Sequence, residues 1–299
     1  GSEMCIRDRA EHHSVLLPFQ ELALRTGATL KWFDLDEEGR VRSDTANEVI
    51  TDRTKIVAVT HVGNTTGAIT DIAPIIRRAH EVGAVFVLDA CQSVPHLKVD
   101  FHALDVDFAA WSAHKMYGPT GVGFLYGKRE MLEALPPANF GGSMVELAWM
   151  DQEAQYMEPP ARFEAGTQPV AQVVAAGVAA EWLMNIGMEN LEAHERTITD
   201  ELLKMGDIDG IRILGPRSNK ERIGTVAFEV EGVHPHDVGQ FIDAQGIAIR
   251  VGHHCAQPVH RHFGVYASNR ASSGIYNSVE DAQALIEALG KVRPFFGVE

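Results

Sequence analysis

The apolar run from Val85 to Leu88 constrains the fold most, because no polar residue alternates within it. A strand that is apolar on both faces is typical of a central parallel strand covered by helices on both sides. The run ends at Asp89, and it follows a helical pattern over 72–82 and a β-rich run over 55–61. This β-α-β order predicts an α/β fold.

Polar residues collect where the expected strands end. Two more apolar runs, over 108–111 and 122–126, flank a polar connection over 112–121, and another β-rich run covers 28–35. In open α/β sheets, ligands bind outside the carboxyl ends of the strands. We therefore expect the functional site at Asp89 and in the 112–121 connection.

The second half of the chain predicts a different unit. A helical pattern runs from Gln168 to about Met205, with no proline after Pro169, and we expect one long helix that joins two domains. The segments expected beyond it are strands over 211–214, 225–230, 247–251 and 271–276, and helices over 236–244 and 279–292. We expect a large domain over residues 10–180 and a smaller α+β domain over 181–299.

Charge and hydropathy exclude two kinds of partner. Lysine and arginine supply 26 positive charges against 41 negative ones, giving a net charge of -15, which opposes binding to nucleic acid. The most apolar stretch, over 170–188, is interrupted by Gln172, Glu181 and Asn185, whereas a membrane-spanning helix needs roughly 20 mainly apolar residues. We expect no membrane segment.

The cysteines indicate the cellular compartment, and the first residues indicate where the recognisable sequence begins. Cys5, Cys91 and Cys255 are odd in number and widely spaced, which is not typical of a disulfide framework, so we expect a cytoplasmic protein. Residues 1–9, beginning with a Gly-Ser pair typical of a cloning scar, carry no periodicity that predicts structure. The recognisable sequence begins abruptly at Glu11, and we expect a large domain that is incomplete at its N-terminus.

Lys115 is a candidate for Schiff-base chemistry. It lies just beyond an expected strand, among small and polar residues, and a Gly-Pro turn follows it. An enzyme dependent on pyridoxal phosphate needs such a lysine, an acid that keeps the pyridine nitrogen protonated, and donors for the phosphate. Asp89 is a candidate for that acid. Spacing alone leaves open a solvated loop lysine and a strand-end cap.

Several separated motifs together resemble one family. They are Glu11-His12-His13, Thr60-His61-Val62-x-Asn64, Asp89-x-x-Gln92, Ser112-x-His114-Lys115, Arg162-Phe163-Glu164-Ala165-Gly166-Thr167 and Arg250-x-Gly252-His253-His254-Cys255-Ala256. In this order, from residue 11 to about residue 294, the chain resembles the SufS-type (group II) cysteine desulfurases, which are class V aminotransferase-like enzymes. The resemblance implies fold type I of the pyridoxal-phosphate enzymes, with a mixed, mostly parallel sheet in the large domain and a smaller α+β C-terminal domain.

The resemblance also implies a cofactor site. Lys115 would bind the cofactor covalently, Asp89 would pair with its pyridine nitrogen, and His12 would stack on its ring and move protons. The other cofactor contacts implied are Gln92 and Asn64 near the ring hydroxyl, Ser112 and His114 at the phosphate, and Thr167 at the phosphate of a neighbouring subunit. A homodimer follows from the last of these.

Cys255 and Arg270 complete the implied chemistry. Arg270, and with it Asn64, would bind the substrate, since a guanidinium suits a carboxylate. The Cys255 thiolate would take sulfur from L-cysteine as a persulfide, leave L-alanine, and pass the sulfur to an acceptor protein for iron-sulfur cluster assembly. The histidines beside Cys255 would favour the thiolate as neighbouring cations.

Simpler alternatives remain open for single residues and for the whole chain. His12 alone reads as a surface histidine, Arg270 as a surface ion pair, Cys91 as a packed side chain, and Cys255 as inert or, with its histidines, as part of a metal site; we expect no metal. Selenocysteine lyase acting on L-selenocysteine is the alternative activity. A non-catalytic fragment is the other alternative, because the family's phosphate-gripping helix start is missing.

Overall fold

A six-stranded sheet forms the centre of the N-terminal half. The computed structural model describes residues 3–298, and the strands of this sheet are β1 (Glu3–Asp8), β2 (Thr29–Phe33), β3 (Ile56–Thr60), β4 (Val85–Asp89), β5 (Phe108–Ser112) and β6 (Gly123–Gly127). Their order is β2-β1-β3-β4-β5-β6, and all neighbours are parallel except β5 and β6. The expected mixed, mostly parallel sheet is confirmed.

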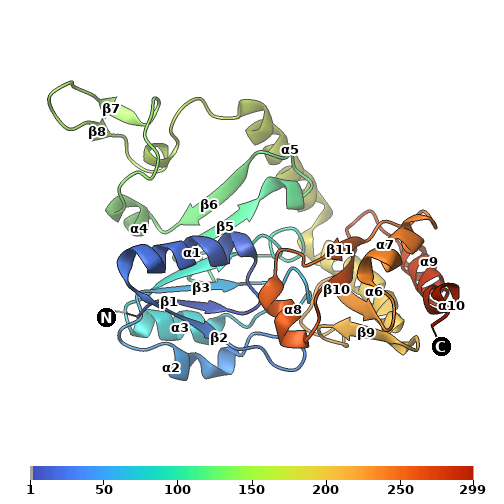
Figure 1. Ribbon diagram of the computed structural model, residues 1–299. Helices are drawn as coiled ribbons and strands as arrows, with labels where there is room; N and C mark the ends of the chain where they lie inside the picture. The colour runs from blue at the N-terminus through green and yellow to red at the C-terminus, as the bar shows by residue number, and fades with distance from the viewer. Residues whose placement is uncertain (1–2, 299) are drawn as a thin grey trace.

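Helices lie on both sides of this sheet. Helix α1 (His13–Thr26) lies across one side, while α2 (Ala46–Val49) and α3 (Ala73–Glu81) lie on the other (Figure 1). On the α3 side, Phe86 and Leu88 of β4 are fully buried in the main core, whereas alternate residues of β4 are half-buried. No residue of α1 is fully buried, so it covers its side of the sheet less completely than the sequence predicts.

Strand β1 and helix α1 were not expected from the sequence. Residues 3–8 form a strand between β2 and β3, pairing in parallel with both, although their sequence shows no strand periodicity. Residues 1 and 2, interpreted as a cloning scar, lie outside the described residues. Backbone hydrogen bonds to the strands on both edges hold such a strand in place. The pattern of side chains does not predict this pairing.

The expected long helix over 168–205 is two helices. α5 (Val170–Ile186) and α6 (Met188–Leu202) meet at Gly187 with a bend of 78°. Gly187 adopts φ +87°, a conformation that is accessible to glycine and costly for other residues. Within residues 3–298 no single helix is long and apolar enough to cross a membrane; the bent pair passes by length and composition only when both helices are counted together.

A second sheet builds the C-terminal half. Its strands are β9 (Ile211–Leu214), β10 (Thr225–Val230), β11 (Arg250–Gly252) and β12 (Ser268–Ser272), in the antiparallel order β11-β12-β10-β9. The helices α6, α7 (Pro235–Asp243) and α9 (Val279–Leu289) enclose its core, and a short α10 (Val292–Phe296) ends the chain (Figure 1). β12 begins three residues before the expected segment, because the buried polar residues at its start conceal it from a hydropathy pattern.

Helix α8 (Gln257–Phe263) ties the two halves together. Val259 of α8 and the preceding Ala256 are buried in the core of the large sheet, together with Phe33. The turn that carries Cys255 therefore lies over the large sheet although it belongs to the C-terminal half. The remaining elements are α4 (Arg129–Ala134), the short 3-10 helices over 43–45, 113–115, 161–163 and 203–207, and the hairpin of β7 (Val145–Leu147) and β8 (Gln155–Tyr156), which projects away from the sheet (Figure 1).

Candidate active site

One cavity of about 590 Å³ gathers most of the expected site residues. It lies where the carboxyl ends of β1, β3, β4 and β5 face the C-terminal half, as the sequence predicts for an α/β sheet. Its lining is His12, His13, Asn64, Gln92, His114, Lys115, Arg250, Val251, His253, His254, Cys255 and Arg270. Each of the four strands thus contributes a polar side chain just beyond its last residue.

Asp89 and Ser112 lie behind this lining. Asp89 Oδ1 accepts a hydrogen bond from the Cys91 backbone N–H at 2.9 Å, and Asp89 acts electrostatically on His12. The Ser112 hydroxyl lies 4.0 Å from the Cys91 sulfur. Burial raises the pKa of Cys91 to about 11, so this cysteine is a thiol at neutral pH and a poor nucleophile.

Lys115 lies in the 3-10 helix that follows β5. Its side chain is half-buried, lines the cavity, and makes no hydrogen bond or ion pair within the described part of the chain. A lysine held at a cavity wall without a partner is free to react with a bound group. This arrangement favours the Schiff-base interpretation over that of a solvated loop lysine.

His12 is fixed at the start of α1. Its Nδ1 accepts a hydrogen bond from the Ser14 backbone N–H at 3.2 Å and lies 2.6 Å from the Ser14 hydroxyl, so the ring caps the helix. Burial lowers the pKa of His12, and the positive charge of Lys115 lowers it further. The lowered pKa favours a neutral His12 imidazole, and because Nδ1 accepts from the Ser14 N–H, Nε2 then carries the hydrogen.

The turn that presents Cys255 has an unusual backbone. The Ala256 N–H donates to the His253 carbonyl at 2.9 Å, and His254 and Cys255 between them have φ values of +51° and +56°. Two consecutive left-handed residues define a type I′ turn, which favours glycine and asparagine. For other residues this conformation costs on the order of 1–3 kcal/mol each and persists only where surrounding contacts hold it.

Residues of the large sheet supply those contacts. The Asn64 side-chain amide donates to the His254 carbonyl at 2.6 Å, and the His13 backbone N–H donates to the Cys255 carbonyl at 2.7 Å. His13 Nε2 accepts from the Gln257 N–H at 3.2 Å. The turn is therefore held on the large sheet while the Cys255 side chain remains exposed.

Arg270 and Arg250 form a pair of guanidinium groups at the same wall. They face each other across β12 and β11, and Arg270 Nη1 donates to the Asn64 carbonyl at 2.9 Å. Burial lowers the pKa of Arg270, and the charge of Arg250 lowers it further; Arg270 nevertheless stays charged at neutral pH. The sequence placed Arg250 in a motif without assigning it a function, and only the strand register reveals its position.

The expectation that the histidines beside Cys255 act as cations is wrong for His254. Burial lowers the pKa of His254 to about 3, with smaller contributions from Arg270 and His260, so His254 is neutral under physiological conditions. It does not act as a cation beside the thiol. Among the charged groups at this wall, Arg270 is the one that interacts electrostatically with Cys255.

Two other expectations concern Thr167 and metal binding. Thr167 is exposed on the loop before α5 and does not line the cavity, and its contact with a second subunit stays a prediction. Across residues 3–298, no group of three or more histidine, cysteine or acidic side chains is arranged to hold a metal ion.

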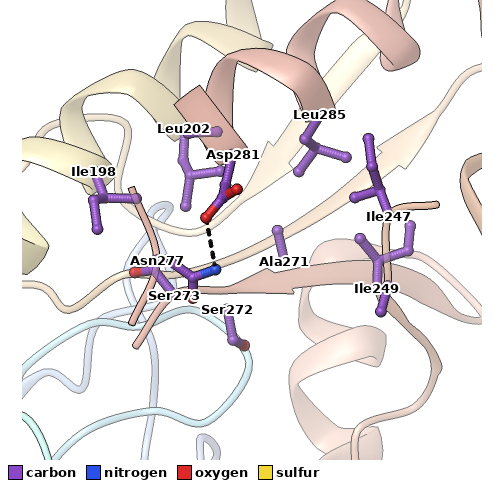
Figure 2. A pocket seen from close by; sticks show the side chains of 12 residues that line it. Ile198, Leu202, Ile247, Ile249, Ala271, Ser272, Ser273, Asn277, Asp281 and Leu285 are labelled. Atoms are coloured by element: carbon purple, nitrogen blue, oxygen red, sulfur yellow. Dashed lines mark hydrogen bonds between the residues drawn. The ribbon is translucent and has the colours of Figure 1, made fainter. Parts of the chain in front are cut away.

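A smaller cavity of about 80 Å³ lies in the C-terminal half. Aliphatic side chains of α6, α9 and the 247–249 segment line it, and its polar edge is the hydrogen bond of 3.2 Å from Asn277 to Asp281 (Figure 2). Asp281 also completes the capping box of α9 with Ser278. These polar groups serve the helix end, so we do not assign catalysis to this cavity.

Comparison with known proteins identifies the family. Residues 2–285 match the family model described as aminotransferase class-V. Over 300 residues the chain is 47% identical to a probable cysteine desulfurase of Mycobacterium leprae, covering 100% of this chain and 71% of that protein. It is 46% identical to a probable cysteine desulfurase of Streptomyces coelicolor, covering 96% and 69% respectively.

Solved structures agree with the sequence relatives. A cysteine desulfurase from Escherichia coli superposes with a TM-score of 0.92, and one from Thermococcus onnurineus with 0.94. Each is 35% identical, and the match covers 98% of this chain and 73% of the other. The chain belongs to the class V aminotransferase family, whose enzymes depend on pyridoxal phosphate.

The residues at the cavity fit this cofactor. An unpaired lysine follows one strand and a carboxylate ends its neighbour, and a neutral imidazole lies within electrostatic range of both. The Asn64 amide oxygen is buried and has no hydrogen-bond partner among residues 3–298, so it can accept a bond from a bound hydroxyl. Lys115, Asp89, Gln92 and His12 are the residues that would hold the ring.

Proposed function

We propose that this protein is a cysteine desulfurase, which converts L-cysteine to L-alanine and retains the sulfur as a persulfide on Cys255. The observation that carries the proposal is the meeting of Lys115 and Cys255 at one cavity, although they come from different halves of the chain. The names of the relatives in Mycobacterium leprae and Escherichia coli support the same activity.

The chain's own residues divide the work. Arg270 and Arg250 would bind the substrate carboxylate, Lys115 and Asp89 would hold the cofactor, and the neutral ring of His12 would lie beside it with Nε2–H as a donor. Bound pyridoxal phosphate supplies an electron sink for the substrate carbons. The Cys255 sulfur, which interacts electrostatically with the positively charged Arg270, is the nucleophile that attacks the substrate sulfur.

The sulfur step balances within these groups. A new S–S bond forms between Cys255 and the substrate sulfur while the carbon–sulfur bond of the substrate breaks. The electron pair of that bond goes to the carbon, which takes up a proton and becomes the methyl group of alanine. No external oxidant or reductant is needed until the persulfide is passed on.

We further propose the SufS-type branch and its partners. The short turn between β11 and α8 leaves Cys255 exposed, which allows a sulfur-acceptor protein to reach it for iron-sulfur cluster assembly. Exposed Thr167 and the exposed apolar side chains that begin at Val170 on α5 support a homodimer. The cysteines are odd in number and widely spaced, which is not typical of the disulfide frameworks of secreted proteins, and this supports a cytoplasmic location.

Turnover of L-cysteine tests the proposal. With added pyridoxal phosphate, the protein should produce alanine from L-cysteine, and Cys255→Ala should abolish that production. Full activity of Cys255→Ala would exclude sulfur transfer through this thiol, and faster turnover of L-selenocysteine would favour the lyase. Folded protein that binds no cofactor would instead support the non-catalytic fragment.

A further inference from the structure

A buried serine bridges two histidines beneath the Cys255 turn. The Ser268 hydroxyl, at the start of β12, lies 2.9 Å from His260 Nε2 and 3.0 Å from His254 Nε2. His260 Nδ1 lies 3.1 Å from the Ala256 carbonyl oxygen. Ser268 is fully buried, and the two imidazoles are nearly so. These contacts form one continuous chain of hydrogen bonds.

The position of each hydrogen follows from the end of this chain. Both imidazoles are neutral, because burial lowers the pKa of His260 and lowers that of His254 to about 3. A carbonyl oxygen can only accept, so His260 carries its hydrogen on Nδ1 and accepts the Ser268 hydroxyl hydrogen on Nε2. The Ser268 oxygen then accepts from His254 Nε2–H.

The opposite direction is unfavourable. If His260 carried its hydrogen on Nε2, towards Ser268 and the nearby Gly252 carbonyl, its Nδ1 lone pair would face the Ala256 oxygen at 3.1 Å. Two acceptors would then be buried against each other without a hydrogen between them, which costs about 1–3 kcal/mol.

The arrangement gives His254 two separate anchors. Its ring is held through Nε2 by Ser268, and its main-chain carbonyl is held by the Asn64 amide at 2.6 Å. His254 is the first of the two left-handed residues in the turn, and Cys255 is the second. Fixing the His254 ring and carbonyl together leaves the peptide that leads to Cys255 little freedom to rotate.

We propose that Ser268 and His260 are positioning residues, which hold His254 in its Nε2–H form and thereby fix the turn that presents Cys255 to the cavity. This inference rests on the proposed desulfurase for its purpose, but the tautomer and the thiol's reactivity are properties of the chain itself. Neither residue lines the cavity itself. They act through His254.

Nuclear magnetic resonance of histidine-labelled protein tests the first half. Long-range couplings between ring nitrogens and ring hydrogens should show His254 as the Nε2–H form and His260 as the Nδ1–H form between pH 6 and 8. An Nδ1–H form of His254, or a protonated ring in this range, would overturn the proposal. This result is decisive even if substitutions at Ser268 fail to fold.

The reactivity of Cys255 tests the second half. In protein without cofactor or substrate, Ser268→Ala should slow the alkylation of Cys255 by iodoacetamide about threefold or more, because the freed turn moves the thiol away from Arg270. Peptide mass mapping measures the extent of alkylation at Cys255. Ser273→Ala is the matched control, since it removes a buried hydroxyl that donates to the Gly224 carbonyl at 3.2 Å, outside this chain. Equal rates in wild type and Ser268→Ala would overturn the proposal. If the tautomers and the alkylation rates are as expected but the wild-type protein does not turn over L-cysteine, only the desulfurase proposal is contradicted.

Discussion

The side-chain amide of Asn64 donates to the main-chain carbonyl of His254 at 2.6 Å, across 190 residues of sequence. The loop after β3 is thereby joined to the turn that carries Cys255. The same loop is joined to β12, because Arg270 donates to the Asn64 carbonyl. Cys255, the proposed nucleophile, and Arg270, the proposed carboxylate-binding residue, are therefore both held by Asn64. This connection explains how the strained turn keeps its conformation.

Asn64→Ala should loosen the Cys255 turn. Removing the amide leaves the buried His254 carbonyl without this donor, which should cost about 1–3 kcal/mol of unfolding free energy. Persulfide formation on Cys255 should slow by about tenfold, measured by rapid mixing with L-cysteine. Asn219→Ala is the matched control, because Asn219 also donates to a main-chain carbonyl, that of Arg196 at 2.8 Å, away from the cavity. An equal rate in both variants would refute the anchoring function of Asn64.

Lys115→Ala should remove the absorbance at roughly 420 nm that covalently bound pyridoxal phosphate gives. The physical reason is that Lys115 is the half-buried lysine at the cavity wall, without a competing ion pair. Lys98→Ala is the control, since Lys98 is exposed and pairs with Glu189 at 2.7 Å. A band of unchanged intensity in Lys115→Ala would assign the cofactor to another lysine.

Arg270→Lys should raise KM for L-cysteine by about tenfold with a smaller effect on kcat. A lysine keeps the charge but cannot bind a carboxylate with two parallel hydrogen bonds. Steady-state kinetics check this, with Arg212→Lys as the control, because Arg212 is exposed and pairs with Glu229 at 3.1 Å. An unchanged KM would place the substrate carboxylate elsewhere.

Acid should destabilise the fold through His61. Burial lowers the pKa of His61 to about 4, whereas the unfolded chain titrates near 6.5. Between these values the unfolded state binds more protons than the folded state, so the free energy of unfolding falls as pH falls from 6.5 towards 4, by up to about 3 kcal/mol. Denaturant unfolding at several pH values measures this slope.

His61→Asn should reduce that slope by the contribution of His61 and leave the part that buried His254 supplies. His102→Asn should leave the slope unchanged, because His102 is exposed. A slope equal to that of wild type in both variants would show that His61 does not contribute to the loss of stability in acid.

The sequence predicts the regular parts of this fold well. Strands β4, β9 and β10 have the bounds that their apolar runs predict. Buried strands are made largely of apolar residues, so a hydropathy pattern reveals them. Strand β1 and the bend at Gly187 escape such reasoning, since tertiary pairing decides the first and a single backbone conformation decides the second. Local patterns carry neither.

The site could be predicted as a set of residues but not as a geometry. The family resemblance identifies His12, Asn64, Lys115, Cys255 and Arg270, and the structure brings these five to one cavity. The neutral state of His254 and the bridging hydroxyl of Ser268 are invisible in the sequence, because burial and distances across the fold determine them. A hydrophilic serine at the start of a strand gives no sign that it is buried.

A single turnover with sulfur-labelled L-cysteine tests the central claim most directly. Protein loaded with pyridoxal phosphate is mixed with less than one equivalent of substrate, alkylated, digested and mapped by mass spectrometry. Labelled persulfide should appear on the Cys255 peptide in an amount equal to the alanine formed. Alanine without label on Cys255, or label on Cys91 instead, would contradict it.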